Sequence, residues 1–224
     1  MRVSLRKSLP KSRGCAVNVM EKAFSSDRAV SLFNIRMLSG EPFSWKDSDL
    51  VYEAFESLSD AVCTNVSEES IEDMIRFSES LGIAFEQMGR IKSSAECFTI
   101  QVELIARNKK LYGDDSMQMA GPLFRAIQSR NHYHDDDCPD LMKYAEEYME
   151  DAFEEVFQSA LSSRRVLRFD PVECSDAYLS VINDVEKILD EEKPARIWDR
   201  KKELLDERGI HWRTPAEMNP NVRF

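Results

Sequence analysis

The sequence has few of the residues that build turns, since its 224 residues include only seven glycines and eight prolines. Sandwiches and barrels of short strands need many turns, so an all-β fold is disfavoured. The chain also lacks a run approaching the roughly 18–20 apolar residues of a membrane span. It contains none of the glycine-rich motifs that bind nucleotide phosphates. These absences favour a helical protein that does not enter a membrane.

Cysteine usage is equally sparse, because the five cysteines are odd in number, widely spaced and form no Cys-x-x-Cys pair. A disulfide framework uses a denser and usually even set, so we expect a cytoplasmic protein. No apolar signal-peptide segment follows the basic start of the chain. Residues 1–20 have the composition of a disordered basic tail, or of a transit peptide that would direct the chain to a mitochondrion or plastid.

Acidic charge is concentrated in the body of the sequence. Residues 1–20 carry five basic and no acidic side chains, and residues 193–224 carry eight basic and five acidic ones. Because the whole chain has a formal net charge of −11, residues 21–192 hold −19. Such a body repels phosphate, which argues against nucleic acid as its ligand and permits a basic partner. The same charge also serves solubility.

Apolar residues recur at helical spacing through most of the chain. Capping residues and glycines divide this pattern into eight expected helices, at about residues 18–40, 47–64, 67–89, 92–112, 116–129, 139–168, 175–189 and 194–208, with a short turn capped by Thr214. The fold is therefore predicted to be all-α, an array of antiparallel hairpins or an irregular bundle. We expect a tail over 1–17, a helical domain over 18–168 and a C-terminal helical extension over 169–224.

One helix pair resembles a tetratricopeptide repeat (TPR). The residues that carry the resemblance are Leu81-Gly82-x-x-Phe85, the turn Gly89-Arg90-Ile91 and Ser94-Ala95-Glu96-Cys97-Phe98, and the ending Leu111-Tyr112-Gly113-Asp114-Asp115 is similar to that of kinesin light chain repeats. The match covers about residues 71–115, with Gln101 and Ser78 departing from the usual pattern. A generic helical hairpin with a glycine turn is the alternative.

The resemblance implies an α-solenoid that binds a protein or peptide in a groove, without catalysis and without a cofactor. Carried onto this sequence, the groove positions are Arg76, Glu79, Ile83, Glu86 and Gln87. Their spacing puts them on one face of the helix, opposite an apolar stripe. Glu79 and Glu86 make that face acidic, so the expected ligand carries lysine or arginine. The alternative is the ordinary solvated face of an amphipathic helix.

Two other functions stay open. A metal-dependent all-α enzyme would use ligands from the segment around residue 136, which contains His132, His134, Asp136, Asp137 and Asp140. The Asp-Asp-x-x-Asp pattern of 136–140 resembles the first metal motif of terpenoid synthases, and residues 183–191 resemble the second. Lys187 stands where that second motif has a serine or threonine metal ligand. The third possibility is a structural subunit of a larger assembly, anchored by its basic ends.

The C-terminal region mixes aromatic and basic residues around Trp198 and Trp212. Such a mixture is found in RNA-binding segments. It is also typical of an amphipathic helix that buries its apolar residues and keeps its charges in water, and we expect the latter.

Overall fold

The computed structural model describes residues 24, 27–63, 68–113, 118–133, 141, 143–144, 147, 158–159, 167–191 and 197–223. Every element in these ranges is a helix, so the all-α prediction is confirmed. In chain order they are α1 (Arg28–Met37), the 3₁₀ turn η2 (Trp45–Asp47), α2 (Ser48–Cys63), α3 (Glu68–Gln87), α4 (Ile91–Tyr112), α5 (Ala120–Asn131), the 3₁₀ turn η3 (Pro171–Cys174), α8 (Asp176–Leu179), α9 (Ile182–Leu189), α10 (Ile197–Asp206) and α11 (Pro215–Met218).

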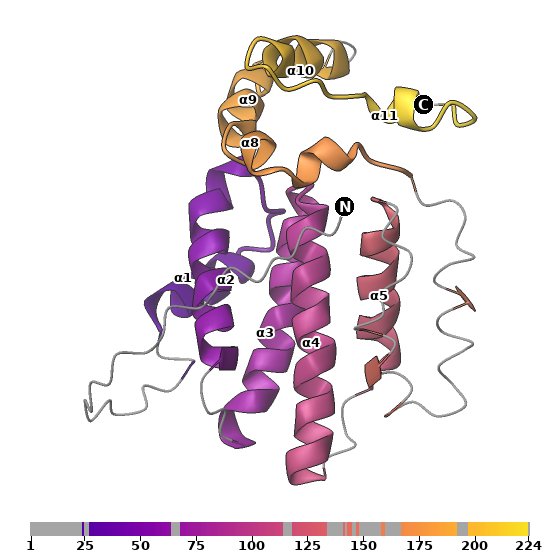
Figure 1. The fold of residues 1–224 in the computed structure, drawn as a ribbon. Coiled ribbons are helices and arrows are strands. Elements are labelled where there is room, and N and C mark those ends of the chain that lie inside the picture. Colours follow the sequence, from indigo (N-terminus) through magenta and orange to yellow (C-terminus); the bar gives the residue numbers. More distant parts are fainter. Residues whose placement is uncertain are drawn as a thin grey trace, which may run out of the picture.

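The helices form two groups. Helices α1 to α5, here called the helical array, pack in chain order: α1 on α2, α2 on α3, α3 on α4 and α4 on α5. Elements η3 to α11, here called the C-terminal module, lie across one end of the array (Figure 1). Each group has its own cluster of buried apolar side chains. Successive hairpins are what a TPR-like array requires, and the repeat assignment itself stays a prediction.

Several predicted helix ends are confirmed by their capping residues. Gly89 ends α3 with a φ of 69°, and Gly113 ends α4 with a φ of 70°. This left-handed conformation favours glycine because it has no Cβ. At the other end of the chain, the Thr214 side chain accepts from the Glu217 backbone N–H and the Glu217 carboxylate accepts from the Thr214 N–H. The predicted capping box of α11 is therefore present.

Two helix predictions are wrong in the described ranges. The helix expected over 18–40 is interrupted at Asp27, whose carboxylate accepts from the backbone N–H groups of Ala29 and Val30 and acts as the N-cap of α1. Residues 18–23 lie outside the described residues. The helix expected over 175–189 is divided into α8 and α9. At the division the Val181 backbone N–H donates to the Tyr178 carbonyl, three residues back, in place of the i−4 bond of an α-helix.

Some expectations lie outside the described residues. These are the basic tail over 1–17, nearly all of the helix predicted over 139–168, and the start of the helix predicted from 194. Among the helices that the structure describes, none combines the length and the apolar character needed to cross a membrane.

Gly82 allows the close approach of α3 and α4. A Cβ on Gly82 would lie nearest the Phe98 ring of α4, only 2.8 Å from Cζ. Phe98 is itself fully buried, and it fills the space that a side chain at position 82 would occupy. The TPR-like pair of small and aromatic residues is therefore a real packing contact, with Phe98 as the partner.

We expect Gly82→Leu to lower the free energy of unfolding by about 1–3 kcal/mol, because the added side chain overpacks the helix pair. Gly121 is the matched control, since it is an exposed helical glycine whose Cβ would meet nothing within 4 Å. Gly121→Leu is expected to leave stability unchanged or raise it by several tenths of a kcal/mol. Urea denaturation of both variants measures the difference, and equal stability of the two would contradict the packing account.

Candidate functional site

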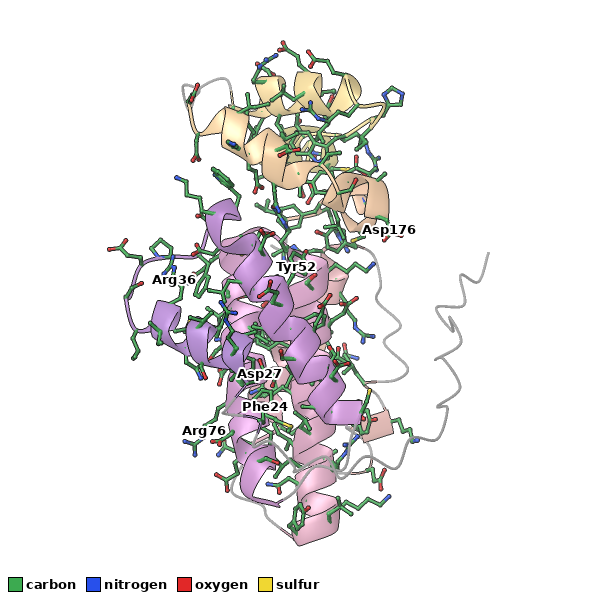
Figure 2. The ribbon with its side chains drawn as sticks, turned by 90° about the vertical axis from the view of Figure 1, so that its left-hand side faces the viewer. Phe24, Asp27, Arg36, Tyr52, Arg76 and Asp176 are labelled. Carbon is green, nitrogen blue, oxygen red and sulfur yellow. The ribbon has the colours of Figure 1, made fainter. Side chains whose placement is uncertain are left out.

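The predicted groove residues do lie on one side of α3, but the structure gives them different environments. Arg76, Glu79 and Glu86 are exposed, whereas Ile83 is half-buried against the array core. Arg76 extends outward from α3 (Figure 2) and forms an ion pair with Glu72 on the same helix, with 3.5 Å between Nη2 and Oε2. It borders a depression of about 250 Å³ between α1 and α3.

At the other end of this face Gln87 is exposed, but its side chain has a partner within the chain. The Gln87 side chain accepts a hydrogen bond of 2.8 Å from the Phe43 backbone N–H, which holds the α1–α2 connection against the end of α3. Burial raises the pKa of Glu86, and the nearby charge of Arg125 partly opposes this shift. The five residues therefore do not line one continuous open groove, because Gln87 has an internal structural partner.

The predicted metal-ligand segment is only partly described. His134, Asp136, Asp137 and Asp140 lie outside the described residues, so their arrangement stays a prediction. The His132 Nδ1 lies 2.5 Å from the Leu167 carbonyl oxygen, and its ring packs at 4.8 Å from that of Phe169. Burial lowers the pKa of His132. Within the described ranges, no group of three or more His, Cys, Asp or Glu residues is arranged to hold a metal ion.

The residues of the second terpenoid-synthase-like motif have a structural role here. Asn183 and Glu186 both lie on α9 and both bind Arg90, which is in the turn between α3 and α4. The Glu186 oxygens accept from the two Nη atoms of Arg90 at 2.7 and 3.0 Å, and the Asn183 oxygen accepts at 2.9 Å. The Asn183 amide also donates to the Ser48 hydroxyl at 2.9 Å. These contacts attach the C-terminal module to the array.

Arg90 is almost fully enclosed at this junction. Its side chain is 3% exposed, against 24% for that of Glu186, and it also donates to the Met88 carbonyl. Burial by itself would lower the pKa of Arg90, but the hydrogen bonds and charge of Glu186 raise it above its ordinary value. The guanidinium is thus held charged inside the protein by bidentate pairing, the geometry for which arginine is suited.

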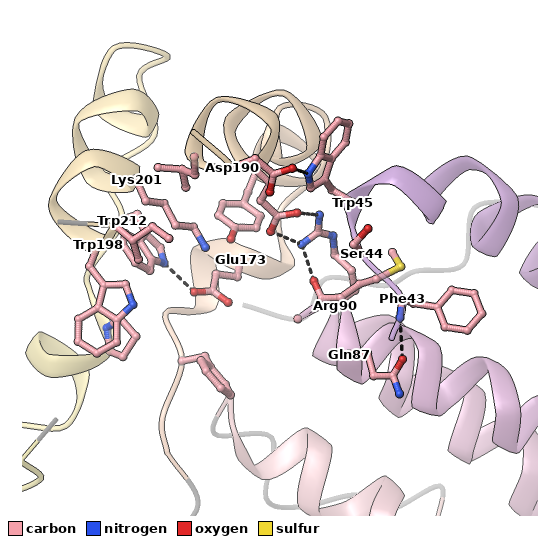
Figure 3. Close-up of a pocket in the computed structure, with 18 residues that line it drawn as sticks. Phe43, Ser44, Trp45, Gln87, Arg90, Glu173, Asp190, Trp198, Lys201 and Trp212 are labelled. Atoms are coloured by element: carbon pink, nitrogen blue, oxygen red, sulfur yellow. Dashed lines mark hydrogen bonds and ion pairs between the residues drawn. The ribbon is translucent and has the colours of Figure 1, made fainter. Parts of the chain in front are cut away.

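A cavity of about 420 Å³ lies beside this ion pair, between the array and the C-terminal module. Six aromatic side chains line it: Phe43, Trp45, Phe169, Tyr178, Trp198 and Trp212 (Figure 3). These include all three tryptophans of the sequence, one in η2, one in α10 and one in the segment after α10. We call this cavity the aromatic pocket.

Hydrogen bonds from indole N–H groups fix two of the tryptophans. The Trp45 Nε1 donates to Asp190 at 3.0 Å, and Asp190 also pairs with Lys46 at 3.1 Å. The Trp212 Nε1 donates to Glu173 at 2.6 Å. Trp45 and Trp198 are half-buried, so part of each ring remains accessible, whereas Trp212 is 2% exposed and belongs to the core of the C-terminal module.

Two charged residues of the pocket, Lys201 and Glu173, form no ion pair within 4 Å among the described residues. Lys201 on α10 has no carboxylate within 4 Å among the described residues; its Nζ lies 4.6 Å from the centroid of the Trp212 ring and 5.5 Å from that of Tyr178. Burial lowers the pKa of Lys201, and burial raises the pKa of Glu173. The negative charge of Glu173 opposes the lowering of the Lys201 pKa, and the positive charge of Lys201 opposes the raising of the Glu173 pKa.

The sequence contains only weak signals for this site. The residues around Trp198 and Trp212 predict a basic amphipathic segment, which is correct for α10, but nothing in the pattern connects these tryptophans with Trp45. Residue 45 precedes residue 198 by 153 positions, and no motif spans that separation. Gln87 was predicted as a groove residue and does line the pocket, although from its structural position beside Phe43.

Comparison of the chain with protein-family models, with curated proteins and with solved structures found no match.

The Arg90 contact yields a stability prediction. Arg90→Ala should lower the free energy of unfolding by about 3 kcal/mol, because it leaves Glu186 and Asn183 without their partner in a largely buried site. Arg76→Ala is the control, since its exposed pair with Glu72 contributes at most about 0.5 kcal/mol. Chemical denaturation followed by circular dichroism measures both. A loss at Arg90 no larger than that at Arg76 would contradict the role given to this ion pair.

Proposed function

We propose that this protein is a non-catalytic interaction module that holds an aromatic side chain of a protein partner in the aromatic pocket. The observation that carries the proposal is the convergence of all three tryptophans, from separate segments, on one cavity. Tryptophan and tyrosine are the residues that most often dominate binding energy at protein interfaces. The volume of about 420 Å³ is within the usual range of ligand pockets, about 300–1,000 Å³.

The polar groups around the pocket support binding rather than bond-making chemistry. Arg90 and Asp190 are engaged in ion pairs, and Glu173 accepts from an indole N–H. None of the eighteen residues that line the pocket is a histidine or a cysteine. Its walls are flat aromatic rings with a few polar groups between them, which is a common composition for a recognition site.

The test begins with peptides selected against the full chain from a random displayed library. We expect the selected peptides to share an aromatic residue and Trp198→Ala to weaken their binding at least tenfold, because Trp198 is a half-buried wall of the pocket. Fluorescence anisotropy with a labelled peptide gives the Kd.

Leu38→Ala is the control for this test, because Leu38, the C-cap of α1, is 87% exposed and does not line the pocket. Its Kd should equal that of the unmodified protein, and circular dichroism should show the same helical content for both variants as for the unmodified protein. Selected peptides that bind the Trp198→Ala protein with unaltered affinity would show that the pocket is not the recognition site.

The exposed side of α3 is a second candidate surface, for a basic segment of a partner. Glu79 and Glu86 are both exposed, and neither has an ion-pair partner within 4 Å among the described residues. Asp73 and Ser80 of α3 and Asn34 of α1 line the depression beside Arg76 and supply further polar groups. These groups support an acidic surface for a basic segment, as the TPR resemblance implies, on a part of α3 that does not include Gln87.

For this surface we expect the double variant Glu79→Gln, Glu86→Gln to weaken binding of a labelled peptide rich in lysine and arginine several-fold. The dependence of the Kd on salt should also become less steep, because two opposite charges are removed from the contact. Glutamine is preferable to lysine at position 86, since Arg125 lies close enough to influence Glu86.

The matched control removes the same charge from another helix. Glu53 and Glu56 are exposed at a spacing of three residues on α2, so Glu53→Gln, Glu56→Gln changes the net charge equally. If both double variants alter the peptide affinity to the same extent, the effect is one of overall charge and the α3 surface is not the binding site.

A further inference from the structure

Lys201 lines the aromatic pocket and forms no ion pair within 4 Å with a carboxylate of the described residues. Its ammonium group points from α10 into the pocket, toward Glu173 and beside Trp212 (Figure 3). It lies against two aromatic faces, at 4.6 and 5.5 Å from their centroids. A cation is attracted to such faces, but they provide no hydrogen-bond acceptor of carboxylate strength. The ammonium therefore keeps donors for a ligand.

Glu173 is the complementary acceptor. Trp212 donates one hydrogen bond of 2.6 Å to its Oε1, which fixes the direction of the carboxylate. A carboxylate has about four acceptor positions, so others remain for a ligand. The remaining charged groups of the pocket are already paired, Arg90 with Glu186 and Asp190 with Lys46. Lys201 and Glu173 are thus a donor and an acceptor that line the same cavity.

The charges of these two groups restrict the ligand. A simple anion would be attracted by Lys201 and repelled by Glu173, and a simple cation would meet the reverse arrangement. A ligand that presents both an acceptor and a donor satisfies both groups at once. The aromatic walls add the requirement for a flat apolar group.

We propose, resting on the pocket as the recognition site, that its ligand is an aromatic amino acid unit, with an oxygen bound by Lys201 and an N–H group bound by Glu173. The peptide units that flank an aromatic residue offer this pair of groups, and so does the free amino acid. The ring would lie against Trp198 and Trp45, the half-buried indoles of the pocket.

Intrinsic fluorescence is a direct readout, because every tryptophan of the chain lines the pocket. The full chain, excited at a wavelength that phenylalanine does not absorb, is titrated with N-acetyl-L-phenylalaninamide and with L-phenylalanine. Two further probes keep the ring and only one polar function, 3-phenylpropionate with an acceptor and 2-phenylethylammonium with a donor. We expect the better of the first two to bind at least tenfold more tightly than either single-function probe.

Variants assign the two contacts. Lys201→Met keeps an unbranched stem and removes the ammonium, and Glu173→Gln keeps an oxygen that can accept from Trp212. Each should weaken the best probe at least tenfold. Lys202→Met is the control, because Lys202 pairs with Glu217 at 2.5 Å and does not line the pocket. It should leave all affinities unchanged.

The outcomes separate this inference from the proposed function. Tighter binding of the blocked compound supports a residue within a partner protein, whereas tighter binding of free L-phenylalanine supports the same contacts with a small-molecule ligand and contradicts the protein partner. Equal binding of all four probes, unaffected by Lys201→Met, overturns the donor–acceptor inference and leaves an apolar pocket. If no probe changes the fluorescence, both proposals are overturned.

Discussion

The ion pair between Arg90 and Glu186 is the contact on which the arrangement of this protein depends. Arg90 stands in the turn that ends the α3–α4 hairpin, and Glu186 stands on α9 of the C-terminal module. Enclosing a guanidinium costs free energy, and the cost is offset only because both oxygens of Glu186, the Asn183 amide and the Met88 carbonyl accept from it. Because these hydrogen bonds join the array to the C-terminal module, they hold the two helix groups in one relative position. Removing any one partner would leave a buried polar group without its hydrogen bond.

The aromatic pocket is a consequence of this docking. Phe43, Trp45 and Gln87 approach it from the array, and Trp198, Lys201 and Trp212 approach it from the C-terminal module. On the side of the C-terminal module, a second set of contacts fixes the segment that follows Trp212. There the backbone N–H and the side chain of Arg213 both donate to the Asp170 carboxylate. A site between two units can present groups that neither unit brings together alone, and such positions are common for ligand pockets.

Local features of the fold follow from the sequence, because they depend on neighbouring residues. The glycines that end α3 and α4 and the capping box at Thr214 act over a few positions, and each is where the pattern predicts it. The expected helix over 175–189 is wrong, since a turn at Ser180 and Val181 divides it, and the apolar spacing does not show that turn. Gly82 and Phe98, which both belong to the pattern that resembles a TPR, lie in contact between α3 and α4.

The site depends on contacts between distant residues, which single-sequence patterns do not specify. Amphipathic spacing identified the side of α3 that carries Glu79 and Glu86, because burial of the opposite stripe determines that side. It gave no indication that Gln87 would bind the Phe43 backbone or that Trp45 would meet Asp190. Asn183 and Glu186 matched a metal motif by residue type alone, and their actual partner is an arginine 93 and 96 positions away.

The central claim is that three tryptophans form one ligand site because the two helix groups are docked together. Their indole N–H groups give separate cross-peaks in a ¹H–¹⁵N correlation spectrum, so each wall of the pocket can be followed individually. Titration with N-acetyl-L-phenylalaninamide should shift all three cross-peaks with a single Kd. The absence of shifts, or shifts that fit unrelated affinities for Trp45 and for Trp198 and Trp212, would contradict a single pocket built by both groups.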